Sequence, residues 1–282
     1  MAEIDRPSIF LNRPPTNNGV NGHVNALAMN GTNNLFVGGS FSNVDGGSIS
    51  VNNIASWNGN SWNILGTNST NNGVNSVVWA LAMNGTNNLF VGGSFSSVDG
   101  GIISANNIAS WDGNSWNLLG TNLTNNGAGR GGSDRVYALA MNGTNQLFVG
   151  GQFTSVDGGI IPATNIASWD GNSWNILGNN GVNNIVSALA MNGTNTLFVG
   201  GTFGSVDGVL ISANNIAVWD GNLWHSIGTG SDSGVSVILS NNIDSIFVAG
   251  SFTISPDGFC TPYLMQGKFF SWCHINEYSF SI

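Results

Sequence analysis

The sequence has few charged residues and very few basic ones. Charged side chains make up 7% of the 282 residues, and Lys and Arg together number only 5. A protein that binds nucleic acid needs a cluster of Lys and Arg to displace counterions from the phosphates. The formal net charge of −9 and the lack of such a cluster in the sequence therefore argue against nucleic-acid binding.

Long hydrophobic runs and cysteines are also scarce. No apolar run approaches the roughly 20 residues that a membrane-spanning helix needs, so we expect no membrane insertion. The acidic N-terminus "MAEIDRPSIF" lacks the apolar core of a secretory signal. This predicts a protein that is cytoplasmic or assembled into a particle. Cys260 and Cys273 are too few for a disulfide framework, and both a single bridge and two free thiols stay open.

The sequence is instead rich in glycine, with 41 residues, and it repeats itself. The segment "LFVGGSFSSVDGG" at 89–101 has near copies that begin at Leu35, Leu147, Leu197 and Ile246. A period in the forties to fifties that carries several strand-like segments is typical of a propeller or a related array. The repeat therefore indicates an architecture made of equivalent units.

Each unit contains two segments that are typical of β-hairpins. In the second unit, "ALAMNGTNNLFVGG" joins two apolar runs around Asn-Gly, and "NNIASWDGNSWNLLG" turns at Asp112-Gly113. Such dipeptides favour tight hairpin turns because both residues tolerate positive φ. Four strands that are apolar on both faces suit a blade packed between two neighbours. The sequence thus predicts an all-β fold, a five-bladed β-propeller of four-stranded antiparallel blades.

We expect the whole chain, 1–282, to form a single propeller domain. Residues 1–19 precede the first repeat as an N-terminal strand and connection. The five repeats span about 20–66, 74–120, 134–178, 182–228 and 235–282.

The N-terminal segment predicts how the ring closes. "SIFLNRPPTNNGVN" aligns without a gap on "WNILGTNSTNNGVN" at 62–75, so residues 8–12 correspond to a fourth strand. Pairing of this strand with the last blade would close the ring and cover a sheet edge. The segment "YSFSI" at 278–282 competes for the same place. The surplus strand would then extend the blade or pair with another subunit.

The pattern A-L-A-x-N-G-x-x-x-L-F-V-G-G-x-F, followed by N-N-I-A-x-W-D-G-x-x-W-x-x-L-G, resembles a known repeat. That repeat occurs in kelch-like bacterial surface proteins and in fungal cortical polarity-marker proteins. The resemblance covers residues 20–228 well and 235–282 poorly, and it implies a propeller fold. In blade number and repeat length the chain is also similar to tachylectin-type lectins.

Paired tryptophans are the candidate ligand-binding residues. Indole rings can stack on sugar faces, and repeated sites would give avidity without strong single-site affinity. The same rings can instead fill the wedge between blades, because aromatic side chains dominate core packing. The pairs are Trp57/Trp62, Trp111/Trp116, Trp169/Trp174 and Trp219/Trp224. Trp79 falls outside this pattern and is the better candidate for an exposed contact.

One aspartate recurs at the same place in every unit. A ring of carboxylates on one rim could collect Ca²⁺ through oxygen ligands. However, Asp-Gly makes a turn by itself, and no second acidic residue accompanies each aspartate, which favours the turn. These weak metal candidates are Asp45, Asp99, Asp157, Asp207 and Asp257. The other metal-type residues, which lack the spacing of a zinc site, are His225, Cys260, Cys273 and His274.

No catalytic constellation is recognisable in the sequence. A propeller enzyme needs an acid, a base and a charge clamp in its channel. A clamp needs several arginines that converge on one point, and Arg130 and Arg135 instead share one loop. We therefore predict no enzymatic activity and no cofactor. One predicted function is a structural or protein-interaction propeller, a surface or virion component that binds a protein partner or assembles with itself. The alternative is a multivalent, lectin-like propeller that binds glycans.

Overall fold

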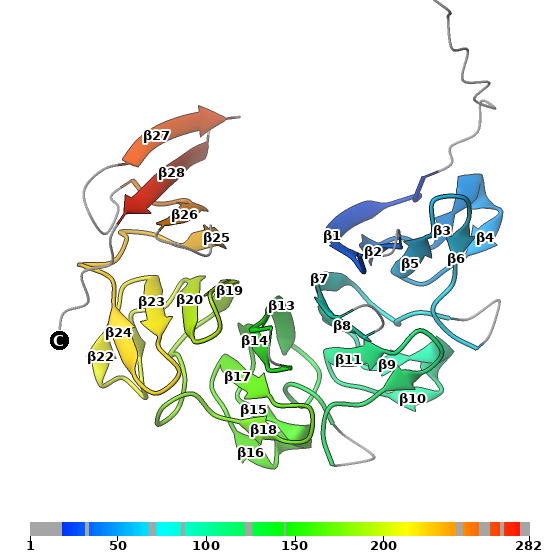
Figure 1. Cartoon of the computed structure of the whole chain (residues 1–282), viewed down its shortest axis with the longest axis horizontal. Coiled ribbons are helices and arrows are strands. Elements are labelled where there is room, and N and C mark those ends of the chain that lie inside the picture. Colours follow the sequence, from blue (N-terminus) through cyan, green and yellow to red (C-terminus); the bar gives the residue numbers. More distant parts are fainter. Residues whose placement is uncertain are drawn as a thin grey trace, which may run out of the picture.

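The protein is an array of β-sheets, seen in a computed structural model (Figure 1). The structure describes residues 19–31, 34–67, 72–85, 88–121, 126–143, 145–240, 245–253, 260–265 and 268–276. Five four-stranded antiparallel sheets follow one another along the chain, one for each repeat. The predicted all-β class with four-stranded blades is thus confirmed. In the described ranges, no helix is long and apolar enough to cross a membrane.

The first four blades share one plan, in which strands consecutive in the blade lie side by side. Blade 1 contains β1 (His23–Met29), β2 (Leu35–Ser40), β5 (Ile54–Trp57) and β6 (Trp62–Asn63). Blade 2 contains β7 (Val78–Asn84), β8 (Asn88–Gly93), β11 (Ile108–Trp111) and β12 (Trp116–Asn117). Blade 3 contains β13 (Arg135–Met141), β14 (Leu147–Gln152), β17 (Ile166–Trp169) and β18 (Trp174–Asn175). Blade 4 contains β19 (Val186–Asn192), β20 (Thr196–Gly201), β23 (Ile216–Trp219) and β24 (Trp224–Ser226).

A small two-stranded hairpin connects the second and third strands of each of these blades. The sequence predicts only a polar connection here. The hairpins are β3 (Asn43–Val44) with β4 (Ile49–Ser50), β9 (Ser97–Val98) with β10 (Ile103–Ser104), β15 (Ser155–Val156) with β16 (Ile161–Pro162), and β21 (Ser205–Val206) with β22 (Ile211–Ser212). In the first three the turn is a 3₁₀ helix, at η1 (Asp45–Gly47), η2 (Asp99–Gly101) and η3 (Asp157–Gly159). Aspartate and glycine permit the turn because both adopt positive φ there, 50° at Asp99 and 70° at Gly100.

Blade 5 departs from this plan. It contains β25 (Val235–Ser240), β26 (Ser245–Gly250), β27 (Cys260–Met265) and β28 (Lys268–Asn276). The sheet order is β25-β26-β28-β27, so the last strand lies inside the sheet and β27 forms its edge. Cys260 lies opposite Cys273 in this register. The side chains of β27 and β28 fall outside the described residues, so the pairing of the two cysteines stays open.

The described residues of the five blades form an open arc (Figure 1). The inner strands β1, β7, β13, β19 and β25 pack on one another in this order. Strands β1 and β25 stand at opposite ends of the arc. The segments for which closure was predicted, 8–12 and 278–282, lie outside the described residues. Closure by a terminal strand therefore stays a prediction.

The core lies between the blades, where a valine of one blade sits on a glycine of the blade before it. A Cβ added at Gly38 would lie 2.5 Å from a methyl carbon of Val78. The same contact recurs at the next three joints, where the glycines are Gly92, Gly150 and Gly200. Glycine at this place lets adjacent sheets approach closely, as the sequence predicts.

An aspartate or asparagine side chain holds the turn between the third and fourth strands. Asp170 accepts hydrogen bonds from the amides of Ser173 and Asn172 at 2.7 and 2.9 Å. These hydrogen bonds hold the pKa of Asp170 well below its usual range, and the bond from the amide of Ser173 has the largest effect. In blade 1, Asn58 stands in the same place and accepts the equivalent amide hydrogen bonds.

We expect Asp170→Asn to lower stability modestly at neutral pH, where the ionised carboxylate contributes, and to reduce the sensitivity of the protein to acid. The pKa of Asp170 is lower in the folded than in the unfolded chain. Its contribution is therefore complete above the unfolded pKa of about 3.9 and is lost as the pH falls through the folded value. Urea denaturation of both proteins between neutral and acidic pH measures this. An equal loss of stability on acidification would contradict the prediction.

Candidate functional site

Three positions at one end of the inner strands vary between blades, although the rest of these strands is nearly identical. The inner strands of the first four blades read VNALAM, VWALAM, VYALAM and VSALAM. The variable residue within them is Asn25, Trp79, Tyr137 or Ser187, and Ser236 in blade 5. The residue before the valine also varies, as His23, Val77, Arg135, Ile185 and Gly234. The third position lies at the end of the second strand, as Ser40, Ser94, Gln152, Thr202 and Ser251.

A β-bulge in each inner strand explains why these side chains project. The pairing of β7 with β8 shifts register between Val78 and Ala80, which makes Trp79 the extra residue. The same shift occurs in the other blades, at Asn25, Tyr137, Ser187 and Ser236. A bulge takes its residue out of the ladder and changes the direction of the side chain. The variable residue thus projects from the ladder, and Asn25 donates a hydrogen bond to the carbonyl of Val78 in blade 2 at 2.9 Å.

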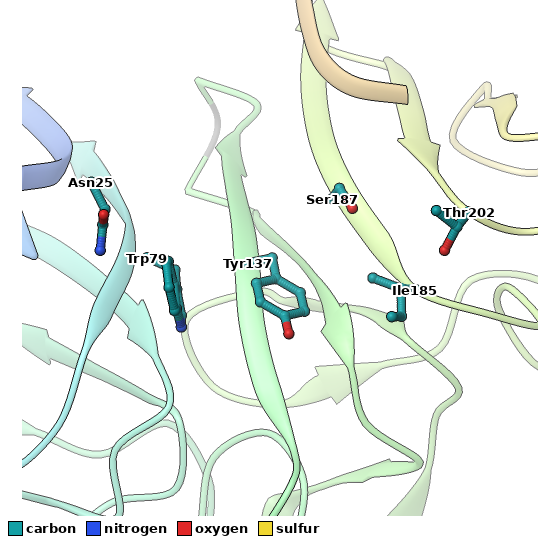
Figure 2. A pocket seen from close by; sticks show the side chains of 6 residues that line it. All are labelled: Asn25, Trp79, Tyr137, Ile185, Ser187 and Thr202. Atoms are coloured by element: carbon teal, nitrogen blue, oxygen red, sulfur yellow. The ribbon is translucent and has the colours of Figure 1, made fainter. Parts of the chain in front are cut away.

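The variable residues of four neighbouring blades line one cavity of about 530 Å³ (Figure 2). The lining residues are Asn25, Trp79, Tyr137, Ile185, Ser187 and Thr202. The ring centroids of Trp79 and Tyr137 are 6.1 Å apart, with planes tilted by 57°. Trp79 is 36% exposed. Blades 2 and 3 therefore present an accessible aromatic pair, with amide and hydroxyl groups on the blades at either side.

Arg135 and His23 stand at the same end of the inner strands as the cavity. Arg135 begins β13 and donates a hydrogen bond to the carbonyl of Ser133 at 2.9 Å. Arg130 lies in the loop that enters β13, and His23 begins β1. Among residues whose side chains are described, the one other basic residue is His225, which pairs with Asp220 at 2.7 Å. Arg130 donates a hydrogen bond to the carbonyl of Gly159 in the turn η3 at 3.4 Å, so its guanidinium lies at the peripheral hairpin rather than at the cavity.

The paired tryptophans lie mostly in the core. The buried ones are Trp111, Trp116, Trp169, Trp174, Trp219 and Trp224. The rings of each pair are 5.4 or 5.5 Å apart and tilted. In these three pairs the second indole donates a hydrogen bond to a carbonyl of the preceding repeat, as from Trp174 to Leu119 at 2.9 Å. This placement favours packing between blades.

The tryptophan pair of blade 1 differs from the other three. Trp57 and Trp62 are half-buried, so part of each ring is accessible. Ligand binding by the tryptophan pairs stays a prediction, and this pair is the one that a ligand could reach.

The repeated aspartates link neighbouring blades. Asp99 accepts hydrogen bonds from the amide and the hydroxyl of Thr67, both at 2.7 Å. Asp157 accepts the equivalent bonds from Thr121, both at 2.8 Å. Both carboxylates are 5% exposed. The aspartate thus joins its turn to the loop that leaves the preceding blade.

Asp207 makes the equivalent link in blade 4, although it is only half-buried. Asp207 accepts a hydrogen bond from the amide of Asn179 at 2.7 Å, whereas Asp45 in blade 1 is exposed. Asp257 lies outside the described residues. Within the described ranges, no three His, Cys, Asp or Glu side chains form a group that could hold a metal ion. Calcium binding by these aspartates gains no support.

Of the cavity residues, the sequence analysis singles out Trp79 alone, because it breaks the spacing of the other tryptophans. The structure places Trp79 between Asn25 and Tyr137 in the row of variable side chains (Figure 2). Tyr137, Asn25 and Ser187 carry a signal of another kind. They occupy a position that varies in an otherwise nearly repeated strand. Comparison of the repeats at that position finds them.

Among solved structures, the chain is similar to the extracellular domain of a putative one component system from B. thetaiotaomicron. The sequences are 14% identical, the TM-score is 0.51, and the match covers 86% of this chain. The chain spans only 28% of that relative's length. No protein-family model and no curated protein matches the sequence.

Two further solved structures resemble the chain more loosely. One contains the WD40 repeats of RRP9, with 14% identity, a TM-score of 0.45 and coverage of 93% of this chain and 84% of the other. The second belongs to a mitotic checkpoint complex, with 14% identity, a TM-score of 0.38 and coverage of 98% and 100%. Both TM-scores are too low to support an argument. From its consecutive four-stranded antiparallel sheets, the chain is a β-propeller repeat protein.

Proposed function

We propose that the protein is a non-enzymatic scaffold that binds a protein partner at the cavity on the inner side of the arc. One observation carries the proposal. The side chains that vary between otherwise equal blades are the bulge residues that line this cavity. A position that served only packing would repeat, as the valine, leucine and methionine of the same strands do.

The chemistry of the cavity suits a polypeptide segment. Trp79 and Tyr137 offer aromatic surface, which is enriched at the energetic centres of protein interfaces. Asn25, Ser187 and Thr202 add groups that can form hydrogen bonds with a main chain. Among the residues that the structure describes, none of those that line the cavity is a carboxylate, histidine or lysine that could serve as a general acid or base. Binding is therefore better supported than catalysis.

A phage-displayed peptide library selected on the full-length protein tests the proposal. We expect the enriched peptides to bind the Trp79→Ser variant at least about tenfold more weakly, since an aromatic anchor contributes roughly 2 kcal/mol or more. Serine is compatible with the fold at this position, because blade 4 has Ser187 there. Peptide affinities for both proteins are measured by titration calorimetry.

The matched control is Ile102→Ser, which removes an apolar side chain that is 70% exposed and lies outside the cavity. Blade 1 carries Ser48 at this place. The control should bind the selected peptides as the wild type does. Equal binding by all three proteins would contradict a role for the cavity.

Carbohydrate is the second candidate ligand. The tilted rings of Trp79 and Tyr137 offer faces on which a sugar can stack, beside amide and hydroxyl groups. A glycan array with wild type and Trp79→Ser separates the two places at which a sugar could bind. Sugar binding that is lost with Trp79 would assign a lectin-like role to the cavity. Sugar binding that survives would direct attention to Trp57 and Trp62, the accessible tryptophan pair.

The proposal also includes the type of the repeats and the location of the protein. We keep as hypotheses that the repeats are of the kelch-like or cortical-marker type, and that the scaffold is a cell-surface or virion component. The low content of charge and the repeated Asn- and Gly-rich loops support a displayed structural component. Immunogold labelling of the producing cells and particles tests the location.

A further inference from the structure

Blade 1 exposes an apolar face whose residues are buried or half-buried in the other blades. On β1, Val24, Leu27 and Met29 are 44%, 60% and 60% exposed. The valines equivalent to Val24 are 0 or 1% exposed, at Val78, Val136, Val186 and Val235. Those valines pack on the preceding blade. Blade 1 thus has the side chains for such a contact, and no described blade covers them.

Blade 5 exposes apolar side chains on the other side of its sheet, the side that in blades 1 to 4 meets the following blade. On β25, Val237 and Leu239 are 44% and 54% exposed. In blade 4 the same positions are Ala188 and Ala190, which pack against blade 5. Blade 5 therefore carries larger side chains on the face that would meet a following blade.

Ala249 sets the distance at which a sheet can pack on this face of blade 5. Gly200 holds the same place in blade 4, where an added Cβ would lie 2.5 Å from Val235 and 2.9 Å from Ile238. A sheet that packs over the methyl group of Ala249 must therefore stay farther away. Val237 and Leu239 are large enough to fill the wider gap, which close packing requires.

We propose that blade 1 of one molecule packs on blade 5 of a second copy, so that the protein associates head to tail. At the four joints within the chain, the face equivalent to that of blade 1 packs on the side of the preceding blade. The exposed face of blade 1 therefore fits the side of another blade. Among the described blades, the one such side left uncovered is that of blade 5. Within one molecule the two faces stand at opposite ends of the arc (Figure 1), which leaves each for another copy.

A contact of this kind has a distinct consequence for assembly. It joins two different surfaces, so each added molecule leaves one free face at either end. The result is a chain of molecules that grows with concentration rather than a closed symmetric pair. The cavity residues take no part in it, so this proposal stands independently of the proposed function.

Sedimentation of the full-length protein over a wide range of concentration tests the proposal. We expect the mass of the wild type to rise with concentration. Leu27→Asp and Leu239→Asp should each give monomers at every concentration. Association would bury the new, unpaired carboxylate in an apolar contact, which is unfavourable. Ile102→Asp is the control, since it places the same charge at an exposed residue outside both faces. It should associate as the wild type does.

A mixture of the two variants gives the sharpest result. Leu27→Asp keeps the blade 5 face and Leu239→Asp keeps the blade 1 face, so together they should form a pair that cannot grow. A contact between two blade 1 faces would instead leave Leu239→Asp associating with itself, which would overturn the proposal. So would a wild type that is monomeric throughout, or a mixture that stays monomeric. Circular dichroism of each variant verifies folding, which both exposed positions should preserve.

Discussion

Trp174→Ala is expected to destabilise the protein by about 3–5 kcal/mol, a large share of the stability of a typical domain. Trp174 is 5% exposed, and its ring centroid lies 5.4 Å from that of Trp169. Its indole N–H donates to the carbonyl of Leu119 at 2.9 Å. The substitution leaves a cavity between two blades and removes the hydrogen-bond donor of a buried carbonyl.

Urea denaturation followed by circular dichroism measures this loss. Trp57→Ala is the matched control, because Trp57 is a half-buried member of the pair in blade 1. We expect a clearly smaller loss there. If both substitutions left stability unchanged, the tryptophans would not be core residues, and the hypothesis that they bind glycans would gain weight.

Gly150→Ala is expected to cost about 1–3 kcal/mol through overpacking, although alanine ordinarily stabilises a strand position relative to glycine. The new Cβ would lie 2.4 Å from a methyl carbon of Val186 and 3.3 Å from one of Leu189. Blades 3 and 4 would have to move apart. Because each blade packs only on its neighbours, loss of one such contact weakens the array at that joint.

Two variants verify the cause of this effect. Gly204→Ala is the control, since no atom lies within 4 Å of a Cβ added at Gly204. Val186→Ala removes the methyl groups that the added Cβ of Gly150→Ala would meet. We expect the double variant, Gly150→Ala with Val186→Ala, to be more stable than the sum of the single losses predicts. Denaturation midpoints that are equal for Gly150→Ala and Gly204→Ala would contradict the proposed contact.

The hairpins and the fold class follow from the sequence because their causes are local. Asp112-Gly113 after β11 forms a turn in which Gly113 adopts a φ of 98° and Asp112 accepts hydrogen bonds from the amides of Asn114 and Ser115. Apolar strands on either side then pair across the turn. With five copies of this unit, a β-propeller array was the predictable outcome.

The roles of the repeated residues could be assigned only from the tertiary structure. A residue can recur in every repeat because it packs between blades or because it binds a ligand, and the sequence pattern is the same in both cases. Trp111 and Trp57 are the same residue at the same place in their repeats. Nevertheless, Trp111 is buried, whereas Trp57 is half-buried. The sequence also could not place the bulge at Trp79, because a bulge depends on the register between two strands. The cavity around it joins side chains from four blades.

The four-stranded blade, its repetition along the chain and its turns are thus predictable from the sequence. Only the tertiary structure decided that the described residues of the five blades form an open arc, that Val24 and Leu239 stand on uncovered faces, and that the variable residues meet in one cavity. The physical reason is the range of the interactions. Turns and strand pairing within a blade act over neighbouring residues, whereas the angle between blades depends on how side chains such as Val186 fit the opposing sheet.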